Sequence, residues 1–538
     1  MPEFVPLAES IVDAVLQHDP GLATEVGDHR YDDRIPDLSP GAVADRVSML
    51  RDAADALSGI DPDAFGPEDQ ADHAILAAIV ERNLFELADV REHEWNPLHH
   101  NPGPMLHALI ARQFAPAEER LASLGGRLAA IPDALATARA VLRDVPRIHA
   151  ETAVGQFAGT AALIRDELPA LVAQEPGMRP AVEPAAAAAL DALAEFDGWL
   201  RARLEGGEPG RDPRLGRPLW EARLWHTLDT ELPAAEVLSR ARQRLDLVGE
   251  QLRAAAAELV GGPESDETVR RALDTLAAEH PDDATIVDLA KVTMAEATAF
   301  VREHDLMTLI DDPLVIEEMP EFARGVAVAY CDPPGPLETA ELPTFYCISP
   351  TPAAWSPERV ESFYREYNSH MIRDLTVHEA MPGHFLQLAH ARRFRAETRV
   401  RSLGWSGPFV EGWATYAEEL MASFGFGGLP VRLQQLKMQL RMSLNAVIDQ
   451  LVHCEDLPEA EAMAMMTGRG FQEEGEAAGK WRRALLTSTQ LSTYFVGYTE
   501  VAEIAAARPF GATPKAWHDA MLAHGSPPPR HLRTLLGV

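Results

Sequence analysis

The chain has 538 residues, of which 46% are hydrophobic, and a formal net charge of −35 at pH 7. This length suits two or three ordinary domains or one large two-lobed body, and the hydrophobic content excludes global disorder. The acidic excess argues against binding to nucleic acids and to anionic membranes, because both require clustered Lys and Arg. We therefore expect neither a nucleic-acid partner nor a membrane partner.

The cysteines and the first residues bear on the cellular compartment. The three cysteines, Cys331, Cys347 and Cys454, are too few for a disulfide framework in a chain of this length. Cys331 and Cys347 could face each other across a hairpin, but reduced thiols are the simpler interpretation. The first residues lack a basic and apolar leader pattern, and no run reaches the roughly 18 to 20 apolar residues of a membrane span. We expect a cytoplasmic protein.

Helical patterns dominate, because Ala, Leu, Glu and Arg fill most segments. The densest cluster of Gly and Pro lies at 206–213, so we place a lobe boundary near 206–218. The expected architecture is mostly α-helical and two-lobed, with an N-terminal helical lobe over 1–215 and a C-terminal lobe over 216–538. In chain order, helices are predicted at 41–57, 67–88, 116–143, 146–170, 184–205, 234–258, 265–279 and 283–303.

One region departs from the helical pattern. Residues 324–331 and 343–350 contain β-branched and aromatic side chains and flank a connection rich in Pro and Gly, which predicts two short strands. These strands form either a structural hairpin or a sheet edge that binds a substrate backbone by strand addition.

Residues 378–384 read HEAMPGH and contain the side chains that a zinc hydrolase requires. On a regular helix, His378 and His384 would point about 120° apart, at roughly 100° per residue. Pro382 and Gly383 permit a bulge or break, after which His384 can turn back toward a metal. The alternative is a Pro-kinked core helix with two hydrogen-bonded histidines.

A second helix can supply the third metal ligand. Ser406 is a suitable N-cap, and Glu411, Thr415 and Glu418 fall on one stripe of the predicted helix. A carboxylate on a mostly apolar helix is costly to bury unless it is paired or coordinates a metal. A Glu from this helix would complete the His₂Glu ligand set of zinc peptidases. The alternative is that Glu411 or Glu418 lies at the surface or in a salt bridge.

Several motifs together resemble a widespread bacterial family known as domain of unknown function 885. The motifs are HEAMPGHFLQ at 378–387, EGWATYAEEL at 411–420, Asp449 with His453, Gln490 with Tyr494 and Gly497, Trp517-His518-Asp519, and His524-Gly525 with Pro528. The resemblance implies a largely helical, zinc-metallopeptidase-like (gluzincin-like) protein. It also implies that His378, His384 and Glu411 bind the metal and that Glu379 is the catalytic carboxylate.

The chain departs from the family pattern in the same motifs. Phe385 follows His384 where members often have a second histidine. Asn445 stands where an Arg is expected, four residues before Asp449, and residues 483–490 replace the usual R-Y-x-x-x-P-G-Q run. These differences mark a divergent member of the family.

Peptide hydrolysis at such a site needs proton transfer and a hydrogen-bond donor. Glu379 would take a proton from the metal-bound water and deliver it to the departing amine. The oxyanion needs a positioned donor besides the metal. Tyr494 and Tyr498 are the first candidates for this donor, and His524 is the next.

Four other side chains are candidates for supporting roles. Glu418 and Asp449 would orient the imidazoles through their far nitrogens, and Asp374 is a further possibility. Arg530 could bind a substrate carboxylate through two parallel hydrogen bonds, which would make the enzyme a carboxypeptidase or dipeptidase.

The main hypothesis from the sequence is a metallopeptidase with one Zn²⁺ per chain that acts on short peptides in a cleft between the lobes. One alternative is a metal-dependent amidase of a small acylated compound. The other is a catalytically inactive helical scaffold that binds a peptide or a partner. The sequence makes no prediction of an oligomeric state.

Overall fold

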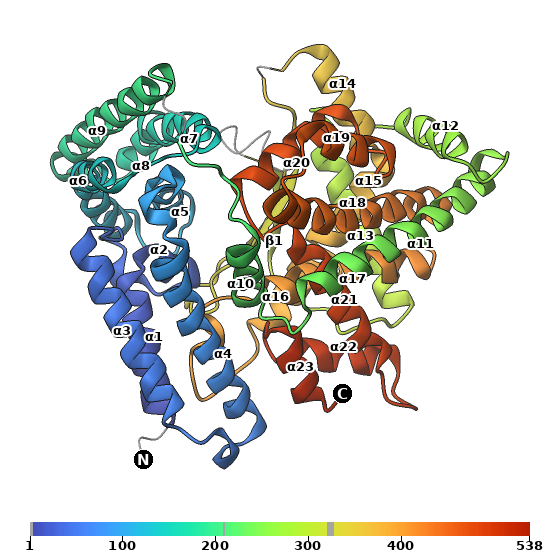
Figure 1. Ribbon diagram of the computed structural model, residues 1–538, viewed down its shortest axis with the longest axis horizontal. Helices are drawn as coiled ribbons and strands as arrows, with labels where there is room; N and C mark the ends of the chain where they lie inside the picture. Colours follow the sequence, from blue (N-terminus) through green and yellow to red (C-terminus); the bar gives the residue numbers. More distant parts are fainter. Residues whose placement is uncertain (1–3, 208–209, 320–327, 354) are drawn as a thin grey trace. The chain divides into compact units, whose positions relative to one another are not determined.

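The computed structural model describes residues 4–207, 210–319, 328–353 and 355–538. The fold is mostly α-helical with one small three-stranded sheet, as the sequence analysis predicted (Figure 1). None of the described helices combines the length and the apolar composition that a membrane crossing requires.

Contacts within the chain divide it into two compact units. The first unit comprises Met1–Pro213, Pro334–Leu342 and Ala396–Gly404, and the second comprises Arg214–Pro333, Pro343–Arg395 and Trp405–Val538. The sequence analysis assigned the two short later segments to the C-terminal lobe, whereas their contacts place them in the first unit.

The first unit contains helices but no strand among its described residues, and it holds two hydrophobic cores. Helices that the sequence predicted are present, although the one expected at 146–170 ends early and a new helix starts two residues later. The helices are α1 (Phe4–His18), α2 (Pro20–Val26), α3 (Pro40–Ser58), α4 (Pro67–Phe85), α5 (Gly103–Ala111), α6 (Ala117–Val141), α7 (Arg147–Asp166), α8 (Leu168–Gln174) and α9 (Arg179–Glu205).

Specific contacts attach the two later segments to the first unit. Val400 and Leu403 are buried in the core formed with α1, α3 and α4. Arg401 forms a buried ion pair of 2.7 Å with Asp72. In the other segment, the Leu337 amide donates to the Val26 carbonyl oxygen at 2.7 Å. These contacts join residues far apart in sequence, which no local pattern reveals.

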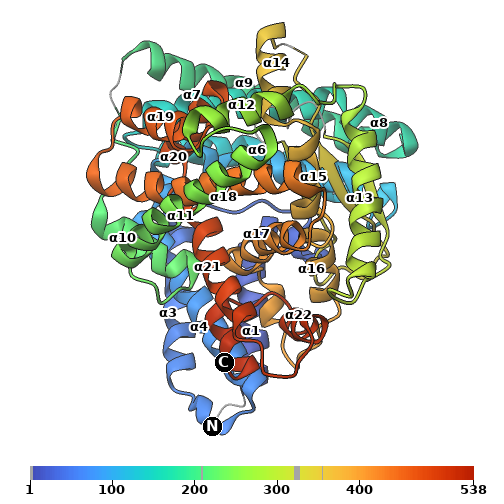
Figure 2. The ribbon, with the colours of Figure 1, turned by 90° about the vertical axis from the view of Figure 1, so that its right-hand side faces the viewer.

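The second unit contains the sheet and the predicted site. Helices α11 and α18 lie side by side, and α17 packs along α21 (Figure 2). The helices are α10 (Arg217–Leu228), α11 (Ala234–Val260), α12 (Asp266–Ala277), α13 (Ile286–Glu303), α14 (Pro357–Glu366), α15 (Ser369–Glu379), α16 (His384–Ala391), α17 (Gly407–Ser423), α18 (Gly428–Glu455), α19 (Glu459–Gly468), α20 (Glu474–Leu486), α21 (Ser492–Ala506), α22 (Pro514–Leu522) and α23 (Pro529–Leu536).

The sheet has the strand order β1-β3-β2, from β1 (Leu314–Glu318), β2 (Ala329–Asp332) and β3 (Thr344–Ile348). Strands β2 and β3 are antiparallel, as a hairpin requires, while β1 pairs in parallel with β3 and was not predicted. The predicted strand at 324–331 lies partly outside the described residues. Both β1 and β2 are therefore edges of the described sheet.

The register of β2 on β3 separates the two cysteines of the sheet. Cys331 is opposite Tyr346, and Tyr330 is opposite Cys347. Since neighbouring residues of a strand point to opposite faces, the two thiols lie on different sides of the sheet. The possibility that they face each other is wrong, and none of the three cysteines forms a disulfide within the described part of the chain.

Candidate metal centre

A helix break positions the two histidines of the HEAMPGH segment. Helix α15 ends at Glu379 and α16 begins at His384, so the break expected at Pro382 is present. The Gly383 amide donates to the Val377 carbonyl oxygen at 2.9 Å, which folds the chain back onto the end of α15. A Cβ atom at Gly383 would lie 1.8 Å from the His378 carbonyl oxygen, so only glycine fits this turn.

Helix α17 holds this turn from the other side. The Ser406 hydroxyl caps the helix by accepting from the Phe409 amide, as expected. The indole of Trp413 donates to the Pro382 carbonyl oxygen at 2.9 Å. The Trp413 side chain is fully buried, so this hydrogen bond fixes the turn against the helix that carries Glu411.

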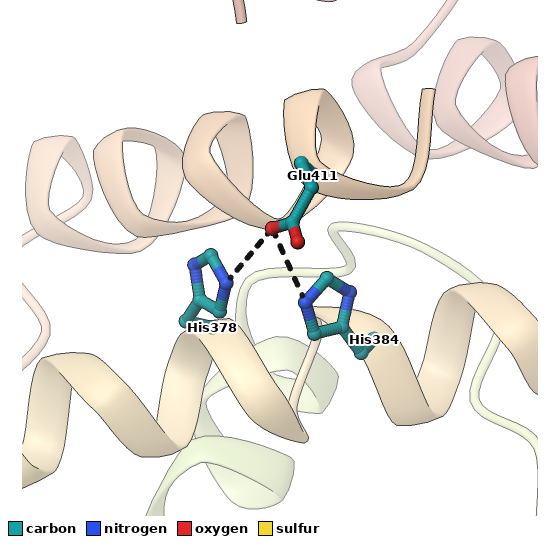
Figure 3. Close-up of side chains that lie close together, drawn as sticks. All are labelled: His378, His384 and Glu411. Atoms are coloured by element: carbon teal, nitrogen blue, oxygen red, sulfur yellow. Dashed lines mark ion pairs between the residues drawn. The ribbon is translucent and has the colours of Figure 1, made fainter. Parts of the chain in front are cut away.

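The three predicted ligands converge (Figure 3). Glu411 Oε2 lies 3.4 Å from His378 Nε2 and 3.6 Å from His384 Nε2. The imidazole rings are nearly perpendicular, at 85°, with centroids 4.7 Å apart. One ligand atom from each residue lies within 4.8 Å of the other two, and among the described residues this is the group that could hold a metal ion.

These distances fit a zinc ion. Ligand atoms around a tetrahedral zinc with bonds of about 2.0–2.1 Å are separated by about 3.3 Å. Glu411 Oε2 is buried and has no hydrogen-bond partner among the described residues, although it faces two imidazole nitrogens. A buried carboxylate oxygen without a hydrogen bond is costly, and a cation bound by all three side chains would satisfy it.

Glu418 orients the first histidine, as predicted from the stripe on α17. Its Oε1 lies 2.6 Å from His378 Nδ1, which directs Nε2 of the same ring toward Glu411. The far nitrogen of His384, Nδ1, is buried without a hydrogen-bond partner among the described residues. The two histidines are thus supported unequally.

The charges of the cluster shift its pKa values. Burial alone would lower the pKa of His378, but Glu411 and Glu418 raise it well above its ordinary value. Burial opposes ionisation of Glu411, yet the two imidazoles hold its pKa well below the ordinary range. Burial raises the pKa of Glu418. Burial and the nearby charge of Glu418 together raise the pKa of Asp374. Glu411 is therefore anionic and ready to bind a cation.

Glu379 lies at the end of α15 beside the sheet. It is 7% exposed, and burial raises the pKa of its carboxyl although His384 and His378 favour the charged form. The backbone N–H of Cys331 in β2 donates a hydrogen bond to this carboxylate. A carboxylate with a raised pKa accepts a proton more readily than an ordinary carboxylate. The sequence gave no indication of the contact with β2.

Helix α21 brings Tyr494 close to Glu411. A Cβ atom at Gly412 would lie 2.3 Å from the Gly497 backbone, so two glycines allow α17 and α21 to cross closely. Burial and the charge of Glu411 raise the pKa of Tyr494, which therefore stays a hydrogen-bond donor. By contrast, the Tyr498 hydroxyl is bonded to Glu419 and, at 2.5 Å, to Arg244.

The remaining predicted residues have other partners. Asp449 accepts hydrogen bonds from the Trp220 indole at 3.2 Å and from the Ser492 hydroxyl at 2.7 Å. Arg530 forms an ion pair of 2.5 Å with Asp229. His524 follows α22 and is half-buried, two residues before Ser526, which accepts a hydrogen bond from α16. Asp449 and Arg530 thus have structural contacts away from the triad.

The structure also locates two of the departures from the family pattern. Phe385 is buried in the hydrophobic core of the second unit. Asn445 is buried within α18, and its Oδ1 has no hydrogen-bond partner among the described residues. Replacement of a second histidine by Phe385 therefore leaves the three converging ligands intact.

A family comparison matches almost the whole chain. The model of a family described as "Bacterial protein of unknown function (DUF885)" matches residues 20–536. The chain belongs to this family. No curated protein matches this DUF885 member.

Solved structures share the fold of this DUF885 protein. One, described as "a putative lipoprotein of unknown function from Shewanella oneidensis", is 25% identical, with a TM-score of 0.84 and 100% of both chains covered. Another, "the putative lipoprotein from Colwellia psychrerythraea", is 15% identical, with a TM-score of 0.81, and the match covers 99% of this chain and 98% of the other. Both are described as lipoproteins, whereas the cytoplasmic location expected here stays a prediction.

Proposed function

We propose that this protein is a zinc-dependent metallopeptidase that hydrolyses short peptides. The observation that supports the proposal most strongly is the buried Oε2 of Glu411, which lies 3.4 and 3.6 Å from two imidazole nitrogens without a hydrogen bond of its own. His378, His384 and Glu411 would hold one zinc ion. When bound, zinc supplies a Lewis acid and a water molecule with a lowered pKa.

The chain's own residues would carry the proton transfers. Glu379 accepts a proton on its carboxylate and gives it to the nitrogen of the departing amine, which its raised pKa favours. The Cys331 N–H holds one side of this carboxylate in place. Tyr494, protonated and close to Glu411, donates a hydrogen bond to the oxygen that becomes negative during attack.

Hydrolysis of a peptide library tests this proposal. Zinc-loaded wild type is expected to cleave varied short peptides, and Glu379→Gln is expected to keep zinc and lose roughly 10²- to 10⁴-fold in turnover. Products would be identified by mass spectrometry. Cleavage of only one class of small acylated compounds would favour the amidase, and folded, zinc-free protein that rejects added zinc would favour the inactive scaffold.

A further inference from the structure

A cationic region lies beside Tyr494 on helices α18 and α20. The chain as a whole has a net charge of −35, so a local excess of cations stands out. Two acids of this region already have close cationic partners: Glu366 pairs with Lys437 at 2.8 Å, and Glu476 pairs with Arg441. For two further basic residues of this region, Lys480 and Arg483 on α20, no carboxylate of the described residues lies closer than 4.0 Å.

Lys480 is the more buried of these two cations. Its side chain is 5% exposed, and its nearest carboxylate is Glu476, at 4.0 Å. Glu476 is already bonded to Arg441 and accepts from the Tyr367 hydroxyl at 3.1 Å. Among the described residues, no carboxylate lies closer to the Lys480 nitrogen than that of Glu476, and burial lowers the pKa of this amine well below its ordinary value.

Arg483 lies one turn further along α20 and is half-buried. Its Nη2 donates to the Tyr494 hydroxyl at 3.3 Å, and its guanidinium carbon is 6.0 Å from the centre of the Tyr494 ring. Over the residues described, no carboxylate lies within ion-pair distance of this guanidinium. Besides burial, the positive charges of Arg441 and Arg483 lower the pKa of Lys480, so an anion bound beside both side chains would favour its charged ammonium form. The two cations thus belong to one site.

Tyr494 connects this site to the metal centre. Besides burial, the charges of Glu411 and His378 act on the pKa of the Tyr494 phenol. Its hydroxyl accepts a hydrogen bond from Arg483. Tyr494 therefore contacts Arg483 and is also influenced by the charges of the proposed zinc ligands.

We propose that Lys480 and Arg483 bind the free C-terminal carboxylate of the substrate. This inference rests on the proposed function and makes the enzyme a carboxypeptidase or dipeptidase. A guanidinium can hold a carboxylate through two parallel hydrogen bonds, and the adjacent ammonium adds a further donor. The assignment moves the carboxylate-binding role from Arg530, whose guanidinium is paired with Asp229.

Binding without turnover tests the inference. Matched libraries of N-acetylated pentapeptides, ending in a carboxylate or in a carboxamide, would be passed over immobilised, zinc-loaded Glu379→Gln protein and quantified by mass spectrometry. Loss of a charge-assisted hydrogen bond predicts that acids are retained roughly 10- to 100-fold more strongly than amides. Arg483→Gln and Lys480→Met, made separately in that background, should each reduce this preference toward parity.

Arg482→Ala is the matched control, because Arg482 is the exposed neighbour of Arg483 on the same helix. It should leave the preference for acids unchanged. Equal retention of acids and amides by the parent protein would overturn the inference, and so would a preference that survives both substitutions. Failure of the proposed function would give a different result from failure of this inference. If the protein is not a peptidase, wild type will not hydrolyse peptides, even if the Glu379→Gln protein retains acids more strongly than amides.

Discussion

Two carboxylates of the second unit, those of Glu411 and Asp449, show how differently a buried acid can be satisfied. Asp449 accepts hydrogen bonds from the Trp220 indole, the Thr489 amide and the Ser492 amide and hydroxyl. Glu411 Oε2 faces two imidazole nitrogens and has no hydrogen bond among the described residues. The first acid stabilises the packing around it, whereas we propose that the second is a zinc ligand.

The sequence analysis predicted different roles for these two acids, Glu411 as a metal ligand and Asp449 as a carboxylate that orients an imidazole. Both lie on helices with mostly apolar neighbours, and both belong to motifs of the family. Only their partners distinguish a structural acid from a ligand. The following predictions test this distinction.

Gly383→Ala is expected to have the largest effect on the fold of the site. The new Cβ atom would collide with the backbone carbonyls of Val377 and His378, so the turn must open. We expect a loss of at least about 3 kcal/mol in the free energy of unfolding, together with loss of zinc.

The control for this substitution is Gly479→Ala. Gly479 lies within α20 and a Cβ atom there meets nothing within 4 Å. This variant should gain up to about 1 kcal/mol and keep zinc. Urea unfolding of both variants, without metal, would measure the difference, and a Gly383→Ala protein as stable as wild type would contradict the account of the turn.

Asp449→Ala and Glu411→Ala should behave in opposite ways. Removing Asp449 leaves the Trp220 and Ser492 donors unpaired, so we expect a loss of about 2–4 kcal/mol in stability while folded protein keeps zinc. Removing Glu411 should abolish zinc binding but change the stability of the metal-free protein by less than about 1 kcal/mol. Zinc loss in the Asp449 variant, with the fold intact, would refute the distinction between the two acids.

Glu418→Gln should weaken metal binding without abolishing it. Glu418 contacts His378 Nδ1 at 2.6 Å and does not belong to the converging triad. Loss of such a supporting carboxylate typically lowers metal affinity about 10- to 100-fold. Competition with a chromophoric chelator would measure the change, and Glu419→Gln, which alters the next residue of α17, is the control.

The pH dependence of zinc binding gives the smallest and most gradual effect. In the metal-free protein, Glu411 and Glu418 raise the pKa of His378 above its ordinary value, so zinc must displace a proton from this ring at pH values below that raised pKa. Affinity should therefore rise about tenfold per pH unit up to the pKa of His378 and level off above it. Glu411 contributes no proton, because its pKa is lowered. Affinity that does not change with pH would exclude His378 as a ligand.

The sequence predicted the features of the site that depend on neighbouring residues. Pro382 and Gly383 indicated a helix break, and the break is present. The spacing of Glu411 and Glu418 on one helix face placed both near His378, where the structure has them. The mostly helical fold followed from composition and periodicity.

Features that depend on distant contacts could not be predicted. The close crossing at Gly412 and Gly497 brings Tyr494 to the site, although neither glycine reveals its partner in the sequence. The parallel pairing of β1 with β3 joins residues about 30 positions apart and leaves no local pattern. The hydrogen bond from the Cys331 backbone to Glu379 is independent of the side chain at position 331 and is invisible in the sequence. The cleft between the lobes stays a prediction.

The central claim is that His378, His384 and Glu411 bind one metal ion, and elemental analysis tests it most directly. Zinc would be measured in purified wild type, in His384→Ala and in His390→Ala, a control on the same helix whose imidazole bonds to the Thr308 carbonyl oxygen. We predict about one zinc per chain in wild type and in His390→Ala, and none in folded His384→Ala. Equal zinc in all three proteins, or none in folded wild type supplied with zinc, would contradict the account.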